Sequence, residues 1–268
     1  MTQLLVLLAL AAAALPAALP AALSAALPAA DLAPTGTLRA SFIASNPVQG
    51  RVDAVTGAVT GPVADLTREL ARRLGVPYVI TPLPDAGAVL ASVKAHTVDI
   101  GFLAYEAARA TQLDYTAPYS LSSSAYAVRA DSPLRTMADV DRAGMTIGAA
   151  KGASQQIYVS ANVKNARVEV MDQVPPHDAL AAMLVSGELD AFAANRTRME
   201  ELARTSPKVR VLSENFLEIG QAIVVDKGGA SRVDELNRFL ADVRASGFIK
   251  SSIDRAGLAG VEVVPAPR

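Results

Sequence analysis

Two hydrophobic patterns alternate along the chain, one typical of amphipathic helices and one typical of short buried strands. In the clearest helix, Pro62 comes first, and apolar side chains recur at spacings of three and four residues at Val63, Leu66, Leu70 and Leu74. This spacing places them on one face of a helix. The other predicted helices are Ala86–His96, Thr136–Ala143, a helix that opens after Lys151–Ser154, Ala179–Val185, a helix after Asn195, Val233–Val243 and Lys250–Ala256.

Apolar runs of strand length separate these helices. They cover Leu38–Ile43, Tyr78–Thr81, a run containing Ile100 and Phe102, Ser120–Val128, Met145–Ala149, Arg167–Met171, Ala191–Ala194, Val209–Leu212 and Gln221–Val225. Two Thr-Gly pairs within Val55–Gly61 predict a small hairpin. Strands that alternate with helices in this way predict an α/β fold with a largely parallel sheet.

A short segment in the second part of the chain is similar in sequence pattern to one in the first part. Leu189–Asn195 (LDAFAAN) is similar to Val98–Tyr105 (VDIGFLAY), and each follows a helix and a polar turn. Asp99 and Asp190 precede their strands in the same way, so we expect both to be structural and to bind local main-chain amides.

This internal similarity predicts two lobes, each with a mostly parallel sheet flanked by helices. Two crossover strands would join the lobes. We place the first lobe at residues 31–124, the second lobe at residues 125–219, and a segment that returns to the first lobe at residues 220–268.

Residues 1–30 differ from the rest, because they carry no charged side chain and consist mostly of leucine, alanine and proline. A leucine- and alanine-rich run followed by small residues is typical of a secretory signal peptide. Pro16, Pro20 and Pro28 interrupt helical continuity, which disfavours a transmembrane helix. We therefore predict that residues 1–30 are a signal peptide and that the chain is exported.

The charge and the scarcity of metal-binding residues exclude several classes of function. The formal net charge is −1, without basic runs, so no nucleic-acid partner is expected. The chain has no cysteine and only two histidines. Disulfides, thiolate metal sites, a cysteine nucleophile and an N-terminal lipid-modified cysteine are therefore excluded, and we expect no metal and no cofactor.

One basic residue, Arg109, stands between two apolar runs within Asp99–Tyr119. From this pattern alone, it is either a surface arginine whose stem packs on apolar groups or a guanidinium that faces a ligand.

Several short motifs are spread over residues 36–258. They are Gly61-Pro62-x-x-Asp65-Leu66, Val98-Asp99, Arg109 followed by Asp114-Tyr115-Thr116-x-Pro118-Tyr119, Lys151-Gly152-Ala153-Ser154, Gly187-Glu188-Leu189-Asp190-Ala191, and Gln221-Ala222-Ile223-Val224-Val225. In this order and spacing, the chain resembles the bacterial periplasmic solute-binding proteins of amino-acid ABC transporters (family 3). The resemblance implies the type II periplasmic binding fold and a ligand cleft between its lobes.

The resemblance also implies roles for residues of the first lobe. Arg109 would bind the ligand α-carboxylate through both arms of its guanidinium. Ala104 would donate its N–H near the same carboxylate, and Phe102 would offer its main-chain carbonyl to the ligand amine. Asn46 stands where relatives often carry an aromatic lid residue, and it either contacts the ligand or forms an Asx turn. Tyr105 is a further candidate contact, or a packing residue.

In the second lobe, the resemblance implies that the N–H groups of Gly152, Ala153 and Ser154 meet the ligand carboxylate when the cleft closes. Ser154 could instead be a plain helix N-cap. The acidic residue that usually binds the α-amino group falls at Asn195, which is also a good cap for the helix that follows it.

Three positions depart from the family pattern. Ala104 lacks the usual hydroxyl, Phe102 is larger than usual, and Asn195 brings no counter-charge for an ammonium group. A desolvated ammonium without a carboxylate partner is costly. The ligand is therefore either a carboxylate without a free α-amine or an amino acid whose amine finds another acid, such as Glu106 or Glu218.

We predict a secreted, monomeric binding protein without catalysis. It would capture a small carboxylate-bearing solute, an amino acid or a related organic acid, and deliver it to an ABC-transporter permease in the inner membrane. Without a lipid-anchor cysteine, a Gram-negative periplasm fits best. The alternatives are a cleft enzyme of dehydratase type on the same fold, with Glu106 as the candidate acid or base, and an extracytoplasmic sensor module.

Overall fold

The structure is a computed structural model that describes residues 29–265. Residues 1–28 of the predicted signal peptide lie outside the described residues, so that prediction stays untested. No helix within the described part of the chain combines the length and apolar composition that crossing a membrane requires.

The elements follow the predicted alternation of strands and helices. The helices are α1 (Ala29–Leu32), α2 (Pro62–Leu74), α3 (Ala86–Lys94), α4 (Ala107–Ala110), α5 (Met137–Val140), α6 (Ser154–Asn162), α7 (His177–Ser186), α8 (Arg196–Thr205), α9 (Ala230–Ala245) and α10 (Phe248–Ala256). The strands are β1 (Leu38–Ile43), β2 (Arg51–Val52), β3 (Val59–Thr60), β4 (Tyr78–Leu83), β5 (Ile100–Ala104), β6 (Leu113–Tyr115), β7 (Ser120–Arg129), β8 (Thr146–Ala150), β9 (Arg167–Met171), β10 (Ala191–Asn195), β11 (Val209–Val211), β12 (Leu217–Asp226) and β13 (Val261–Val263).

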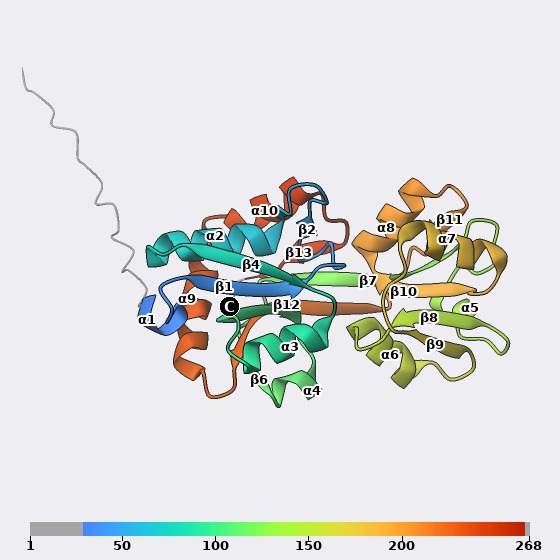
Figure 1. The fold of residues 1–268 in the computed structure, drawn as a ribbon. Coiled ribbons are helices and arrows are strands. Elements are labelled where there is room, and N and C mark those ends of the chain that lie inside the picture. The colour runs from blue at the N-terminus through green and yellow to red at the C-terminus, as the bar shows by residue number, and fades with distance from the viewer. Residues whose placement is uncertain (1–28, 266–268) are drawn as a thin grey trace, which may run out of the picture.

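These elements form two lobes that lie side by side (Figure 1). One lobe carries α2, α3, α9 and α10, and the other carries α5 to α8. The main sheet has the strand order β4-β1-β5-β12-β7-β10-β8-β9, with parallel pairs in β4-β1-β5 at one end and in β10-β8-β9 at the other. The α/β fold with two lobes is therefore confirmed.

The two long strands β7 and β12 run from one lobe into the other. β7 pairs antiparallel with β12 over Ser120–Ser124 and with β10 over Ser124–Val128. β12 continues past this pairing to β5 over Gln221–Val224. These strands match the two predicted crossover strands, and the predicted lobe boundaries at residues 125 and 219 fall inside them.

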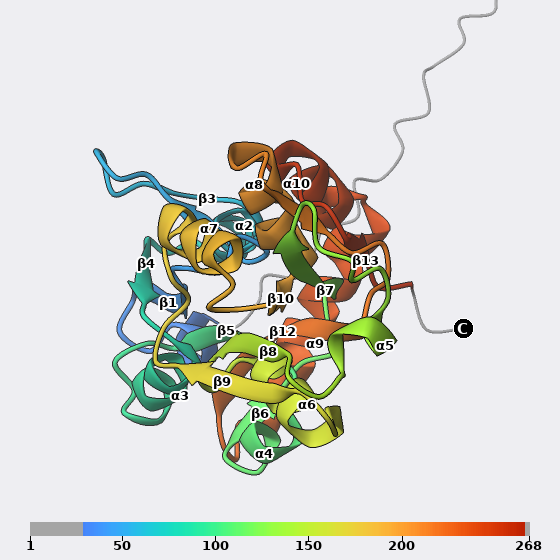
Figure 2. The same cartoon turned by 90° about the vertical axis from the view of Figure 1, so that its right-hand side faces the viewer.

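Each lobe has its own apolar core. In the first lobe, Val63, Leu66, Leu70 and Leu74 of α2 are all buried, as their spacing predicts. Gly75 ends this helix with a left-handed backbone, φ 70°, which glycine adopts at little cost. Figure 2 shows the second lobe end on, with α7 and α8 on one face of β10, β8 and β9 and α6 on the other.

Asp99 and Asp190 each form a hydrogen bond that links the starts of two neighbouring strands. Asp99 accepts a hydrogen bond from the main-chain N–H of Arg39 over 2.8 Å, and Asp190 accepts one from the N–H of Thr146 over 2.8 Å. Their predicted structural role is confirmed, although the amides belong to the neighbouring strand rather than to the local chain. This bond fixes where each pair of parallel strands begins.

The hairpin lies earlier than predicted. Its strands are β2 and β3, so the predicted range Val55–Gly61 holds the turn and only the second strand. The carboxylate of Asp53 accepts hydrogen bonds from the N–H groups of Val55 and Thr56. The first Thr-Gly pair, Thr56-Gly57, therefore belongs to this Asx turn, and the first strand of the hairpin lies before it.

Candidate functional site

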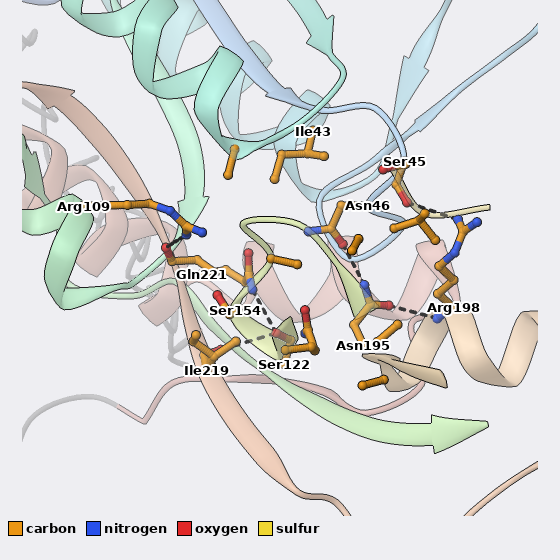
Figure 3. A pocket seen from close by; sticks show the side chains of 18 residues that line it. Ile43, Ser45, Asn46, Arg109, Ser122, Ser154, Asn195, Arg198, Ile219 and Gln221 are labelled. Carbon is orange, nitrogen blue, oxygen red and sulfur yellow. Dashed lines mark hydrogen bonds between the residues drawn. The ribbon is translucent and has the colours of Figure 1, made fainter. Parts of the chain in front are cut away.

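A pocket lies between the lobes, where β1, β5, β8 and β10 end (Figure 3). Its cavity volume is about 90 Å³. It is lined by Ile43, Ser45, Asn46, Ala86, Ala104, Arg109, Ser122, Ala150, Ala153, Ser154, Gln155, Val174, Ala193, Ala194, Asn195, Arg198, Ile219 and Gln221. The carboxyl ends of parallel strands are the usual ligand-binding edge of open α/β sheets.

Arg109 connects the two lobes at one side of this pocket. Its short helix α4 follows β5, so the guanidinium can reach back over the end of that strand. Nη1 donates to the main-chain carbonyl of Ala104 over 3.1 Å, and Nη2 donates to the carbonyl of Gly152 in the second lobe. Among the described residues, no carboxylate forms an ion pair with Arg109. The cation therefore has donors available for an anionic solute.

The amino-terminal end of α6 opens into the pocket. Ala153 is the N-cap and offers no side-chain cap, while Ser154 is the first helical residue. The interpretation of Ser154 as a plain N-cap is therefore wrong. Only 5% of Ser154 is exposed, and its Oγ has no hydrogen-bond partner. A buried hydroxyl without a partner at a helix N-terminus is suited to donate a hydrogen bond to an anionic group.

Asn195 and Asn46 meet across the cleft. Nδ2 of Asn195 donates to Oδ1 of Asn46 over 3.1 Å. Oδ1 of Asn195 accepts from the N–H of Arg198 and so caps α8, while Oδ1 of Asn46 accepts from the N–H of Val48 in an Asx turn. Both asparagines thus have the structural roles considered from sequence and line the pocket as well.

Arg198 lines the pocket as well, although it is not among the contacts predicted from the sequence. Nη1 donates to the carbonyl of Ser45 in the first lobe over 3.3 Å, and Nη2 donates to the carbonyl of Pro175 over 2.8 Å. Nε is shielded from water and has no partner. Burial lowers the pKa of Arg198, while the negative charge of Glu201 raises it. Arg198 follows Asn195 by one helical turn on the same helix face, and this spacing could have indicated from the sequence that it lies near the same pocket.

Neutral polar groups form another part of the lining. Nε2 of Gln221 donates to Oγ of Ser122 over 2.9 Å, and Oε1 of Gln221 accepts from Nε2 of Gln49 over 3.3 Å. Nε2 of Gln155 donates to Oγ of Ser124 over 2.8 Å. None of these groups carries charge, so they can orient a solute without adding to the field of the two arginines.

Seven of the predicted contacts gather at this pocket, and two do not. Six are lining residues, and Gly152 reaches the pocket through the carbonyl that Arg109 binds. They are Arg109, Ser154, Asn195, Ala104, Ala153, Asn46 and Gly152.

The predicted ligand contacts of Phe102 and Tyr105 are corrected, because the structure does not place these two residues in the lining of the pocket. The Phe102 side chain is fully buried and packs edge-on against Tyr119, and its carbonyl already accepts from Nε2 of Gln49 over 3.1 Å. Tyr105 is 51% exposed and packs against Tyr115, in agreement with its predicted packing role.

The charged residues of the lining are Arg109 and Arg198, and no Asp or Glu of residues 29–265 joins them. In particular, Glu106 and Glu218, which were considered as partners for a ligand amine, are not lining residues. Nor does the described part of the chain bring together three or more His, Asp or Glu side chains that could hold a metal ion. The site is a small pocket in which two arginines stand among neutral polar and apolar side chains.

A family model, that of the bacterial extracellular solute-binding proteins, family 3, matches residues 43–256. No curated protein sequence matches the chain.

Several solved structures have folds similar to that of this chain. ArgBP from T. maritima, solved as a mutant, is 22% identical, with a TM-score of 0.71, and the match covers 84% of this chain and 96% of that one. AbpA from Streptococcus pneumoniae, bound to L-arginine, is 20% identical, with a TM-score of 0.72 and coverages of 84% and 96%. A putative ABC-transporter binding component from Wolinella succinogenes, complexed with lysine, is 19% identical, with a TM-score of 0.73 and coverages of 82% and 95%.

Two further neighbours connect the same fold with an enzyme lineage and with a sensor domain. One is the ancestral amino-acid-binding protein AncCDT-1, a precursor of cyclohexadienyl dehydratase, at 19% identity and a TM-score of 0.71. The other is a histidine kinase sensor domain, also at 19% identity and a TM-score of 0.71. Identities at this level establish the type II periplasmic binding fold and leave the solute to be argued from the pocket.

Proposed function

The chain belongs to family 3 of the bacterial extracellular solute-binding proteins, and we propose that it captures a small carboxylate-bearing solute in the pocket between its lobes. The observation that carries this proposal is Arg109. It lines the pocket, it donates hydrogen bonds to two main-chain carbonyls, and no carboxylate of the described residues pairs with it. A guanidinium in this position is suited to bidentate binding of a carboxylate.

Contacts between the lobes support capture by closure. Arg109 with Gly152, Asn195 with Asn46, and Arg198 with Ser45 all join the two sides of the pocket. The lobes are connected by β7 and β12, and two long strands of this kind can bend as a hinge. We propose that the solute enters an open form and strengthens these contacts as the lobes close.

The lining supports binding without turnover. A dehydratase on this fold would need a group that gives or takes a proton against the leaving group. The charged residues of the lining are arginines, which stay protonated at all ordinary pH values. Glu106, the acid or base considered for an enzyme, is not among the lining residues.

Export, location and partners complete the proposal. We propose that the signal peptide directs a monomeric protein to the periplasm and that the closed, loaded form delivers its solute to an ABC-transporter permease in the inner membrane. The structural likeness to binding proteins of amino-acid ABC transporters supports this role.

A thermal-shift screen against amino acids, monocarboxylates, dicarboxylates and neutral sugars tests the proposal. A solute present at about 100 times its Kd should stabilise the protein by about 2.7 kcal/mol through mass action. We expect carboxylate-bearing solutes to raise the melting temperature and to be recovered unchanged by NMR after prolonged incubation. Stabilisation by sugars alone, or chemical conversion of the bound solute, would contradict the proposal.

A further inference from the structure

We propose that the solute is a small linear dicarboxylate without an ammonium group, held with one carboxylate at Arg109 and the end of α6 and the other at Arg198, Asn195 and Asn46. This inference rests on the proposed function and names the class of solute for the same pocket.

The charge of the lining is the first argument. Arg109 and Arg198 bring two positive charges, and no acidic side chain of residues 29–265 lines the pocket to balance them. Two cations that line one partly desolvated pocket repel each other and favour negative charge between them. A monocarboxylate would balance one of these charges, whereas a dicarboxylate balances both.

The placement of the two arginines is the second argument. Figure 3 shows Arg109 and Arg198 on opposite sides of the pocket, with Ser154 and Gln221 between them. Arg109 comes from the first lobe after β5, and Arg198 comes from α8 of the second lobe. One anionic group cannot make close contacts with guanidinium groups on both sides, so two anionic groups joined by a short chain fit this arrangement.

The Arg109 side offers a further set of donors for the first carboxylate. Ser154 begins α6, a nine-residue helix, and its Oγ is buried without a partner. The partial positive charge of a helix N-terminus favours an anion at this place. A carboxylate can accept from the Arg109 guanidinium on the first lobe and from the Ser154 hydroxyl on the second.

The Arg198 side has donors that are not used within the protein. A guanidinium has five N–H groups. Each Nη atom of Arg198 donates one hydrogen bond to a main-chain carbonyl, and Nε is buried with no partner. The amide group of Asn195 lies at the same side and donates to Asn46. A second carboxylate would use these donors and would offset the cost of burying the Arg198 cation.

The same features disfavour ligands with positive charge. Asn195 stands where the family resemblance places an acid for the α-amino group, and Glu106 and Glu218 do not line the pocket. An ammonium or a second guanidinium would therefore enter a site that already holds two cations, without a counter-charge. AbpA and the Wolinella succinogenes protein are bound to L-arginine and lysine in their structures, and this pocket is unsuited to either solute.

Isothermal titration with matched solutes tests this inference. The probes are succinate, glutarate and adipate as diacids, butyrate, pentanoate and hexanoate as monoacids of the same length, L-glutamate as glutarate with an added amine, and L-arginine. We expect the best diacid to bind at least about tenfold more tightly than its matched monoacid. Glutarate should bind more tightly than L-glutamate, and L-arginine should not bind.

The variant Arg198→Gln provides the decisive comparison, with Arg204→Gln as control because Arg204 is exposed on the same helix. Arg198→Gln should weaken diacid binding at least about tenfold and remove the preference for the diacid over its matched monoacid, because the lost contact with Ser45 affects both solutes and the lost cation affects only the second carboxylate. Arg204→Gln should leave both unchanged. Diacid binding that Arg198→Gln does not weaken would overturn the inference.

The two proposals fail in different ways. If an amino acid binds more tightly than every diacid, and Arg109→Gln abolishes its binding, the inference is wrong and the proposed function stands. If none of these carboxylates binds, the proposed function and the inference both fall.

Discussion

Asn195 of the second lobe donates a hydrogen bond from Nδ2 to Oδ1 of Asn46 of the first lobe, over 3.1 Å. This neutral contact stands where the family resemblance places an acid for the ammonium group of an amino acid. It closes one side of the pocket and leaves the charge of the lining to Arg109 and Arg198. The absence of negative charge at Asn195 is therefore as informative as the presence of the arginines.

Asn195→Asp should weaken dicarboxylate binding, because the new carboxylate would repel the second carboxylate of the solute and would pair with Arg198. We expect a loss of at least about tenfold in affinity, measured by titration with the best diacid. In the same variant, L-glutamate should gain relative to glutarate, since its amine would then have a counter-charge. An unchanged preference between these two solutes would show that Asn195 does not face that part of the ligand.

Ser154→Ala should separate stability from binding. The Ser154 hydroxyl is buried without a partner, and such a group costs about 1–3 kcal/mol. Its removal should leave the free energy of unfolding of the unloaded protein equal or higher, measured by urea denaturation. Solute affinity should fall about five- to tenfold, because one hydrogen bond to a carboxylate is lost. A clear loss of stability without a loss of affinity would contradict the assigned role.

Asp99→Asn should destabilise the first lobe without changing the pocket. The Asp99 side chain is 3% exposed, and it accepts from the main-chain N–H and the guanidinium of Arg39. Loss of this charge pair should lower the free energy of unfolding by about 2–3 kcal/mol. Asp131→Asn is the matched control, because Asp131 is 77% exposed and its pair with Arg129 should contribute less than about 1 kcal/mol. Equal effects of the two substitutions would contradict the account of Asp99.

The lowered pKa of Glu69 predicts that the free energy of unfolding falls at acidic pH. Hydrogen bonds from Arg72, and then from Arg73, lower the pKa of Glu69 to about 2 from an ordinary value of 4.5. Because the folded value lies below the unfolded one, this pair stabilises the protein above about pH 4.5 and ceases to do so as the pH falls toward 2.

Urea denaturation of the protein and of Glu69→Gln at a series of pH values checks this dependence. The difference in the free energy of unfolding should be full above about pH 4.5 and should shrink between pH 4.5 and 2. A difference that stays constant down to pH 2 would show that the arginines do not depress the pKa of Glu69.

Local patterns in the sequence were sufficient for most of the fold. The buried face of α2 was predicted from the helical spacing of its apolar residues alone. The resemblance between Val98–Tyr105 and Leu189–Asn195 located β5 and β10, two of the strands that end at the pocket. The hairpin was misplaced, because Asp53 forms its turn through a side chain whose partners only the structure shows.

The pocket was predicted only where residues lie near a recognisable motif. Arg109, Ser154 and Asn195 each follow a strand end that the pattern marks. Gln221 could not be placed, because its partner Gln49 is 172 residues away in the chain. Arg198 was missed because its meaning depends on Ser45, which the sequence alone does not place opposite α8.

Titration of Arg109→Ala with the best carboxylate solute of the screen tests whether Arg109 binds that carboxylate, with the substitution Arg238→Ala at an exposed arginine of α9 as control. If Arg109 binds the solute carboxylate, its removal should cost about 2–5 kcal/mol of binding free energy, while the melting temperature of the unloaded protein changes little. Arg238→Ala should bind as the unmodified protein does. An Arg109→Ala variant that is folded and retains its affinity within about threefold would contradict the assignment of this pocket as the carboxylate site.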